Sequence, residues 1–346
     1  MKYKSPYKGV DTSNVICLAT NENSYALPQE IQEKLYEEIN FTNRYPKIDN
    51  EKLKQLLADR YNVKSENIVI GAGSDELLTL TALKYVDNGE NTIMSDPSFF
   101  RYKDITELAG GNCKLVKGTN FCHDLEAIKE SIDDKTKIVF ICNPNNPTGT
   151  YISSEEIESF VKSVPENIIV VVDEAYFDFV YPKTNQSSVK LIDNYPNVLV
   201  FRTFSKYFGL AGLRIGYAIG NENVIEGINR LRSPYNVSSL AQTAAIEVLK
   251  NNGFFDNTYY EEINRERQFY YDAFKEIDIE YIPSQANFIF AKFGDICEEW
   301  CEQLKHLNII IRPCRMFGYP EYVRISIGNH AENMMLVQAL NKIIKK

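Results

Sequence analysis

The sequence predicts an α/β protein with a larger domain built on a mostly parallel, doubly wound sheet and a smaller α+β domain. Three apolar runs carry this prediction, because "KIVFIC" (137–142), "NIIVVVD" (167–173) and "NVLVF" (197–201) are short and rich in β-branched residues. Such runs are typical of strands buried on both faces, as in a parallel sheet. Strand-like and helix-like segments alternate along this part of the chain, which favours a doubly wound arrangement.

The larger domain begins with an expected strand at 67–71 and a helix at 74–86. Ser74 is the expected N-cap of this helix, whose leucines fall at helical spacing. In chain order, the further strands expected in this domain are 91–95, 113–116, 137–142, 167–173 and 197–201, and the further helices lie near 100–109 and at 124–132.

The last third of the chain changes character, and we assign it to the smaller domain. The expected helices are 238–252, 257–276, about 295–306 and about 330–345, and the expected strands are 287–293, 309–312 and 322–328. We place the larger domain at 30–235 and the smaller domain at 236–346 together with the N-terminal segment 1–29. No flexible linker separates them, so the two domains are expected to pack on each other.

The composition of the chain argues against several classes of protein. The chain has 346 residues and a formal net charge of −9, which argues against a general nucleic-acid surface. No stretch approaches the roughly 20 apolar residues that cross a bilayer. Seven cysteines at irregular spacing, without a CxxC pair or an apolar leader, favour a reduced, cytoplasmic setting. Cys297 and Cys301 lack accompanying histidines, so we expect thiols and no metal site.

Chemically suggestive residues follow the expected strands, where open α/β sheets bind their ligands. After the strand at 67–71, backbone N–H groups of Gly73, Ser74 and Asp75 at a helix start can hold a phosphate, although a plain strand–helix turn would use the same residues. After the next strand come three aromatic residues that can cover a planar ring or pack in the core, namely Phe99, Phe100 and Tyr102. The segment "NPNNPTG" (143–149) holds three asparagines, more than one turn requires, which favours an amide contact to a ligand.

Two charged residues end apolar strands, where folding alone does not call for them. Asp173 closes the strand at 167–173, and an unpaired carboxylate there is costly, so it needs a buried cation or N–H partner. A helix cap or a distant arginine is the structural alternative. Tyr176 can face the same space. Lys206 follows the strand at 197–201 and precedes Arg214 within a glycine-rich stretch.

Together these residues meet the needs of pyridoxal phosphate. This cofactor requires a lysine for its aldehyde, an acid for its ring nitrogen, a phosphate cup, a stacking group and donors to its phenolic oxygen. Lys206 and Asp173 supply the first two. Arg214 offers the fixed guanidinium fork that suits a phosphate dianion.

The ordered blocks "NPNNPTG", "VVDEAYFDF" and "FSKYFGLAGLRIGY" resemble those of the fold-type I aminotransferases. Five further blocks narrow the resemblance to the histidinol-phosphate aminotransferase group: "LATNEN" (18–23), "NRYP" (43–46), "GAGSDELL" (71–78), "IIIRP" (309–313) and "VRISIG" (323–328). The resemblance covers nearly the whole chain.

The resemblance implies a role for each matching residue. Lys206 would form the Schiff base and act as the catalytic base, Asp173 would hold the pyridine nitrogen, Tyr176 and Asn146 would donate to the phenolic oxygen, and Phe99 would stack on the ring. The residues that it places around the phosphate are Gly73, Ser74, Asp75, Ser205 and Arg214.

The resemblance also assigns the substrate side and an assembly. Arg324 would bind the acidic group of the substrate, with Arg312 as a possible second cation, Asn146 alongside, and Tyr25 over the entrance. Tyr45 of "RYP" would reach the phosphate of a neighbouring subunit, which implies a homodimer with shared active sites.

The implied activity is ping-pong transamination between a phosphorylated or acidic amine and 2-oxoglutarate, with histidinol phosphate as the leading amine and histidine biosynthesis as the setting. Two alternatives stay open: a decarboxylase of a phosphorylated amino acid that uses the same cofactor, and an aminotransferase of aromatic or other amino acids. The chain departs from the family pattern at Ser24, where a proline is usual, and in the segment 313–323, which carries Arg315. A binding module without catalysis would not need Lys206 and Asp173 together.

Overall fold

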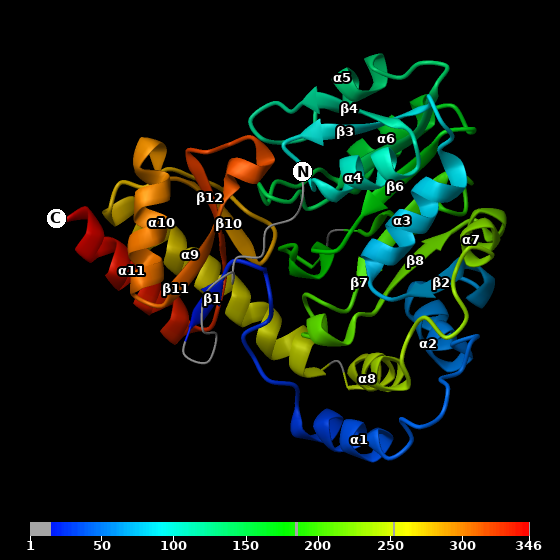
Figure 1. Ribbon diagram of the computed structural model, residues 1–346, viewed down its shortest axis with the longest axis horizontal. Coiled ribbons are helices and arrows are strands. Elements are labelled where there is room, and N and C mark those ends of the chain that lie inside the picture. Colours follow the sequence, from blue (N-terminus) through cyan, green and yellow to red (C-terminus); the bar gives the residue numbers. More distant parts are fainter. Residues whose placement is uncertain (1–14, 184–185, 252, 346) are drawn as a thin grey trace.

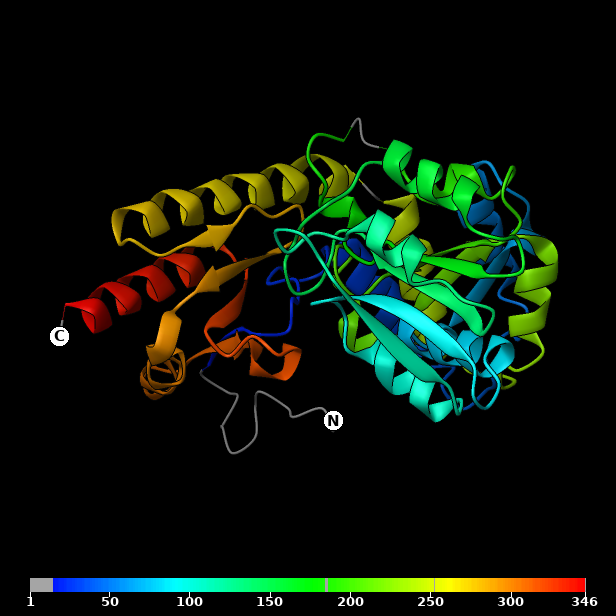
Figure 2. The same cartoon turned by 90° about the horizontal axis from the view of Figure 1, so that it is seen from above.

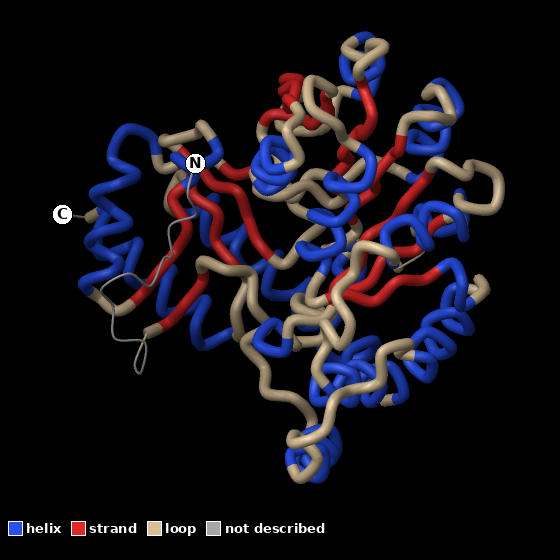
Figure 3. Tube along the Cα trace, turned by 45° about the vertical axis from the view of Figure 1, so that its right-hand side comes forward, coloured by secondary structure: helices blue, strands red, loops and turns tan. Residues whose placement is uncertain are grey.

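The computed structural model describes residues 15–183, 186–251 and 253–345, which form two β-sheets covered by helices. Figure 1 shows the larger sheet beside the smaller one, and Figure 3 shows their strands as two separate groups. The predicted α/β architecture of the chain is therefore confirmed. No helix in the described part of the chain is long and apolar enough to cross a membrane.

The larger sheet has seven strands in the order β2-β8-β7-β6-β5-β3-β4. Six of them agree with the sequence prediction to within two residues at either end. The strand that the sequence analysis missed, β8, runs antiparallel to both of its neighbours, β2 and β7, and the other neighbouring pairs are parallel. The bounds are β2 (Ile68–Gly71), β3 (Asn91–Asp96), β4 (Asn112–Lys117), β5 (Thr136–Cys142), β6 (Ile169–Asp173), β7 (Val198–Thr203) and β8 (Gly216–Gly220).

Both faces of this sheet are buried, as the apolar runs predict. Along β6, Val170 and Val172 point into one apolar cluster, and Val171 points into the other. The face with Val171 is covered by α3 (Ser74–Tyr85), α4 (Arg101–Leu108) and α7 (Glu222–Asn229). The opposite face is covered by α2 (Glu51–Tyr61), α5 (Leu125–Glu130), α6 (Ser154–Ser163) and α8 (Ser239–Lys250).

The smaller sheet has five strands in the order β1-β11-β12-β10-β9. The N-terminal strand β1 pairs in parallel with β11 and so joins the start of the chain to its last third. Helices α9 and α11 lie side by side near this sheet (Figure 2). The bounds are β1 (Ile16–Leu18), β9 (Tyr281–Ile282), β10 (Phe288–Lys292), β11 (Ile309–Pro313), β12 (Tyr322–Ser326), α9 (Tyr260–Glu276), α10 (Cys297–His306) and α11 (His330–Ile344).

Two details bear on the predicted boundaries. The N-cap of α3 is Gly73, with φ of 84°, so the expectation that Ser74 caps this helix is wrong by one residue. Only a residue that tolerates positive φ turns the chain from β2 into α3 in this way. Helix α1 (Gln29–Ile39), which the sequence analysis did not identify, packs with α8. The division of the chain at residues 30 and 236 stays a prediction.

A buried charge cluster joins the ends of β6 and β7. The Arg202 guanidinium lies 3.2 Å from a Glu174 carboxylate oxygen and 3.3 Å from an Asp178 carboxylate oxygen. Glu174 also accepts hydrogen bonds from the Ser187 hydroxyl and the Ser188 N–H, each at 2.6 Å. Because Glu174 directly follows Asp173 in the sequence, this cluster fixes the backbone at the edge of the sheet where ligands are expected.

We expect Arg202→Met to lower the free energy of unfolding by about 3–5 kcal/mol, because Glu174 would remain buried without its cation. Urea unfolding measures this change. Lys64→Met is the matched control, since Lys64 pairs with Glu222 at 2.8 Å while their side chains are 73% and 48% exposed. That change should cost about 0–1 kcal/mol. Equal losses in both variants would contradict a structural role for the buried cluster.

Candidate active site

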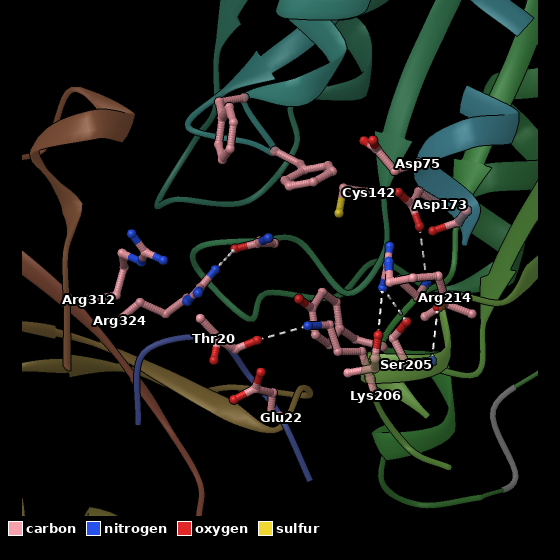
Figure 4. A pocket seen from close by; sticks show the side chains of 18 of the residues that line it. Thr20, Glu22, Asp75, Cys142, Asp173, Ser205, Lys206, Arg214, Arg312 and Arg324 are labelled. Atoms are coloured by element: carbon pink, nitrogen blue, oxygen red, sulfur yellow. Dashed lines mark hydrogen bonds between the residues drawn. The ribbon is translucent and has the colours of Figure 1, made fainter. Parts of the chain in front are cut away.

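A cavity of about 600 Å³ opens beyond the carboxyl ends of β5, β6 and β7. Side chains from three parts of the chain line it (Figure 4). The N-terminal segment contributes Thr20 and Glu22, the larger sheet contributes the residues that follow its strands, and the smaller sheet contributes Arg312 and Arg324. The cavity therefore lies where the sequence analysis expected a ligand.

Lys206 lies in this cavity, just beyond the end of β7. Its Nζ donates a hydrogen bond of 2.8 Å to the carbonyl oxygen of Thr20. Burial, and then the positive charge of Arg324, lower the pKa of Lys206 to about 8. A larger share of this lysine is therefore neutral near physiological pH than of an ordinary lysine, and the neutral amine is the form that attacks an aldehyde.

Asp173 is the last residue of β6 and is buried in the cavity wall. One of its oxygens accepts a hydrogen bond of 3.1 Å from the Ala175 N–H, and the other accepts one of 2.8 Å from the Tyr102 hydroxyl. Burial raises the pKa of Asp173 to about 6. The expected N–H partner is present, but the phenol partner was missed. Tyr102 is fully buried and packs in the core, which is one of the two placements that the sequence analysis left open, whereas Phe99 and Phe100 line the cavity.

The three asparagines of the segment 143–149 have different roles. Asn143 and Asn145 shape the turn, since Asn143 exchanges two hydrogen bonds with the backbone of Ile152, and the Asn145 amide donates to the Pro97 carbonyl and the Thr148 hydroxyl. Asn146 lines the cavity, where its oxygen accepts a hydrogen bond of 2.6 Å from Arg324. Only one of the three is therefore available to a ligand.

Tyr176 lines the same wall of the cavity. Its hydroxyl accepts a hydrogen bond of 3.0 Å from the Asn21 amide, and burial raises its pKa to about 12. The phenol therefore stays protonated at physiological pH and keeps a proton to donate to an oxygen in the cavity.

Groups that can bind an anion gather at the N-terminus of α3, and we call this place the phosphate cradle. Ser74, Asp75, Ser205 and Arg214 line it, and an Arg214 nitrogen lies 3.4 Å from the Ser205 hydroxyl. The N–H groups of Ser74 and Asp75 have no partner within the helix, because they belong to its first turn. Gly73 differs from the expectation, since its N–H already donates to the Gly71 carbonyl at 2.8 Å.

Gly73 contributes through its missing side chain instead. A Cβ at this position would lie 2.7 Å from an Arg214 nitrogen, so only glycine lets the guanidinium reach over the helix start. The Asp75 carboxylate would repel a phosphate, but Arg101 pairs with it at 2.8 Å. The cradle therefore offers two N–H groups, a hydroxyl and a cation to an anion, which fits the phosphate of pyridoxal phosphate.

Arg312 and Arg324 are direct cross-strand partners on β11 and β12. Both are buried, and both extend from the smaller sheet into the cavity (Figure 4). The Ala19 carbonyl accepts a hydrogen bond from each of them, at 3.3 Å from Arg312 and at 2.8 Å from Arg324. Two fixed guanidinium groups on one wall are able to bind a small anion.

Neither Tyr25, which was predicted to lie over the substrate entrance, nor Tyr45, which was predicted to reach the site of a neighbouring subunit, lines this cavity. The Tyr25 hydroxyl donates a hydrogen bond to Glu262, and the Tyr25 ring packs edge-on at 5.5 Å against Tyr259. Tyr45 is 82% exposed and stacks at 4.6 Å on Tyr235. Phe99 does line the cavity, together with Phe100, so both rings border the ligand space. The sequence analysis assigned no role to Thr20 and Glu22, although both belong to the block "LATNEN" (18–23).

Residues 13–340 match the family model of aminotransferase class I and II. The chain belongs to this family. It is 38% identical over 337 residues to histidinol-phosphate aminotransferase 2 of Haemophilus influenzae, which covers 97% of this chain and 92% of that protein. It is also 38% identical over 334 residues to histidinol-phosphate aminotransferase of Caldicellulosiruptor saccharolyticus, with 95% and 92% covered.

Solved structures agree with this assignment. The histidinol-phosphate aminotransferase of Sinorhizobium meliloti in complex with pyridoxal 5'-phosphate has the same fold, with a TM-score of 0.92 at 24% identity over 100% of this chain and 95% of that one. The enzyme of Clostridium acetobutylicum gives a TM-score of 0.88 at 26% identity over 95% and 99%. The predicted family, fold class, aminotransferase activity and pyridoxal phosphate cofactor are thereby confirmed.

The low pKa of Lys206 yields a stability prediction for the cofactor-free aminotransferase. The folded chain binds fewer protons than the unfolded chain between pH values of about 8 and 10.5, so its stability should rise through this window. Below the window, a buried charged amine destabilises the fold. We expect Lys206→Met to raise the free energy of unfolding by about 1–2 kcal/mol at neutral pH, and the gain to shrink as the pH rises. Denaturant unfolding across the window measures it, and a pH-independent difference would contradict the assignment.

Proposed function

We propose that this aminotransferase exchanges an amino group between histidinol phosphate and 2-oxoglutarate, by a ping-pong mechanism, in histidine biosynthesis. The observation that carries the proposal is the cross-strand pair of Arg312 and Arg324, which presents two buried cations on the cavity wall. Both substrates carry an anionic group that such a pair can bind. The two bacterial relatives with 38% identity bear the name of this enzyme, which supports the proposal.

Each residue around the cofactor would have one task. Lys206 would hold the cofactor aldehyde and then move a proton to and from the substrate carbon as general base. Asp173 would keep the ring nitrogen protonated, and Asn146 and Tyr176 would donate to the phenolic oxygen. Pyridoxal phosphate, when bound, supplies the electron sink for the bond that breaks at the substrate carbon. Phe99 would cover one face of the ring.

The phosphate cradle would fix the other end of the cofactor. Ser74 and Asp75 would bind through their N–H groups, Ser205 through its hydroxyl, and Arg214 through its guanidinium, while Gly73 leaves room for that guanidinium. Arg324 is held by the Ala19 carbonyl and the Asn146 oxygen, so it would meet a substrate anion without reorienting. Arg312 would add a second contact to the same anion.

A second candidate substrate class is the aromatic amino acids. Phe100, Met316 and Phe317 line the cavity, and the Phe100 and Phe317 rings meet edge-on at 5.9 Å. Such an apolar wall accepts a flat side chain, and the imidazole of histidinol phosphate and the ring of an aromatic amino acid both meet that description. The two substrates differ chemically in that histidinol phosphate carries a phosphate group and an aromatic amino acid does not.

We also propose that the enzyme acts in the cytoplasm as a homodimer with shared active sites. Several apolar side chains in the C-terminal half of α1 and in the segment between α1 and α2 are exposed, namely Tyr36, Ile39, Phe41, Tyr45 and Ile48. A second copy of the chain would cover this surface, since exposed apolar patches of this kind mark interfaces. Tyr45 would then contact the cofactor phosphate of the partner subunit. All seven cysteines are free thiols, which suits a reducing compartment.

The substrate assignment is tested by following the visible absorption band of the enzyme-bound cofactor. Histidinol phosphate should bleach the band, and 2-oxoglutarate should restore it; no such band should form in Lys206→Ala. Arg324→Gln should raise KM for both substrates by roughly 10–100-fold, because each loses a hydrogen-bonded ion pair. A response to phenylalanine or tyrosine alone would favour the aromatic candidate. Release of carbon dioxide without a keto acid would instead indicate a decarboxylase.

The shared active site is tested by mixing two inactive variants, Lys206→Ala and Tyr45→Ala. In a mixed dimer, the chain with Lys206 receives Tyr45 from its partner, so one native site should form and activity should return. Mixing Lys206→Ala with Asp173→Ala is the control, because both residues belong to the cavity of one chain. No recovery in the first mixture, with dimers confirmed by sedimentation, would contradict the contribution of Tyr45 across the interface.

A further inference from the structure

Tyr102 connects the buried carboxylate of the site to the core of the larger sheet. It lies in the first turn of α4, and its hydroxyl donates a hydrogen bond of 2.8 Å to Asp173 Oδ2. The Asp173 Oδ1 atom accepts from the Ala175 N–H at 3.1 Å. Each carboxylate oxygen therefore has one donor from the protein, which leaves further lone pairs for a ligand.

Contacts with two other aromatic rings also hold the ring of Tyr102 in place. It stacks on Phe140 of β5 with a centroid distance of 4.5 Å and an interplanar angle of 4°. It also meets the edge of Phe99 at 5.5 Å and 87°, and Phe99 lines the cavity. One buried side chain thus supports both the carboxylate and an aromatic wall of the cofactor space.

We propose that Tyr102 is a positioning residue, which aims the Asp173 carboxylate at the cofactor ring nitrogen. Its hydroxyl stabilises the ionised carboxylate and adds no positive charge beside it. The proposal rests on the proposed role of Asp173 as the partner of that nitrogen. An arginine or lysine at this place would also stabilise the carboxylate, but its positive charge would oppose a protonated ring nitrogen. A neutral phenol donates a hydrogen bond and leaves the negative charge available.

The groups around Asp173 make this donor important. Burial, Glu174 and Asp75 favour the protonated form of Asp173, while Tyr102 and the Ala175 N–H favour the charged form. The Cys142 thiol also borders this space, and its raised pKa keeps it neutral. The pKa of Tyr102 is itself raised far above its ordinary value by burial and by Asp173, so the phenol remains a donor. Tyr102 is the only side chain with a hydrogen bond to this carboxylate among the described residues.

The test compares Tyr102→Phe with the parent protein by titrating the cofactor-free chain with pyridoxal phosphate. Removing one hydrogen bond to a charged group should weaken cofactor binding by roughly tenfold. The decline of affinity in acid should also begin at higher pH, because the loss of the donor raises the pKa of Asp173 above its present value of about 6. Both quantities are read from the equilibrium spectrum and need no turnover.

Tyr270→Phe is the matched control. Tyr270 is also fully buried, and its hydroxyl donates a hydrogen bond of 2.9 Å to Asn333, but it does not line the cavity. If Tyr102 acts only through packing and stability, both variants should lower the melting temperature while cofactor affinity and its pH midpoint stay as in the parent. That result would overturn the positioning role.

Two further variants separate the possible failures. If Asp173→Asn weakens cofactor binding and Tyr102→Phe does not, Tyr102 has no positioning role; if neither does, the role of Asp173 itself is overturned. In the Asp173→Asn background, Tyr102→Phe should change affinity by much less than tenfold. Should Tyr102→Phe not fold, a ring-fluorinated tyrosine at position 102 keeps the packing and donates more strongly. It should move the pH midpoint downward, and an unchanged midpoint would count against the proposal.

Discussion

A single short piece of backbone holds together the charged groups on which this site depends. The Ala19 carbonyl accepts hydrogen bonds from Arg312 and Arg324, and the next carbonyl, at Thr20, accepts one from Lys206. Lys206 follows the larger sheet, whereas the two arginines belong to the smaller one. The segment lies between them because β1, immediately before it, pairs with β11. Three cations of the cavity are thus placed relative to one another by two neighbouring peptide groups.

The strand register explains why the arrangement is rigid enough for catalysis. Arg312 and Arg324 are cross-strand partners, so their separation is set by the hydrogen-bonded ladder of β11 and β12. Asp173 ends β6 and Lys206 follows β7, its parallel neighbour, and the buried cluster around Arg202 fixes the ends of both strands. Functional groups on strand ends hold their positions better than groups on long loops. The site therefore draws its precision from the two sheets.

The sequence predicted best those residues whose presence folding alone could not explain. A carboxylate at the end of the apolar strand β6 and a lysine beyond β7 stand out because burial of charge is costly. The structure places Asp173 and Lys206 in one cavity as expected. Two of the hydrogen-bond partners of these residues, Tyr102 and the Thr20 carbonyl, come from distant parts of the chain and left no such signal. In the sequence, Tyr102 cannot be distinguished from other core aromatic residues, and a backbone carbonyl is present at every position. The strand β8 was missed as well, because its place in the sheet depends on antiparallel pairing with the strands β2 and β7.

The local charge of the cavity is opposite to that of the whole chain, and this contrast is consistent with the proposed substrates. The protein carries a net charge of −9, yet the cavity contains four basic side chains, Lys206, Arg214, Arg312 and Arg324. Three carboxylates share the cavity, and one of them, Asp75, is paired with Arg101. Since a low-dielectric cleft concentrates its own field, small anions respond to these four cations more than to the distant surface. Net charge thus bears on large polyanionic partners, while the cavity selects its small anionic ligands through fixed guanidinium groups and one amine.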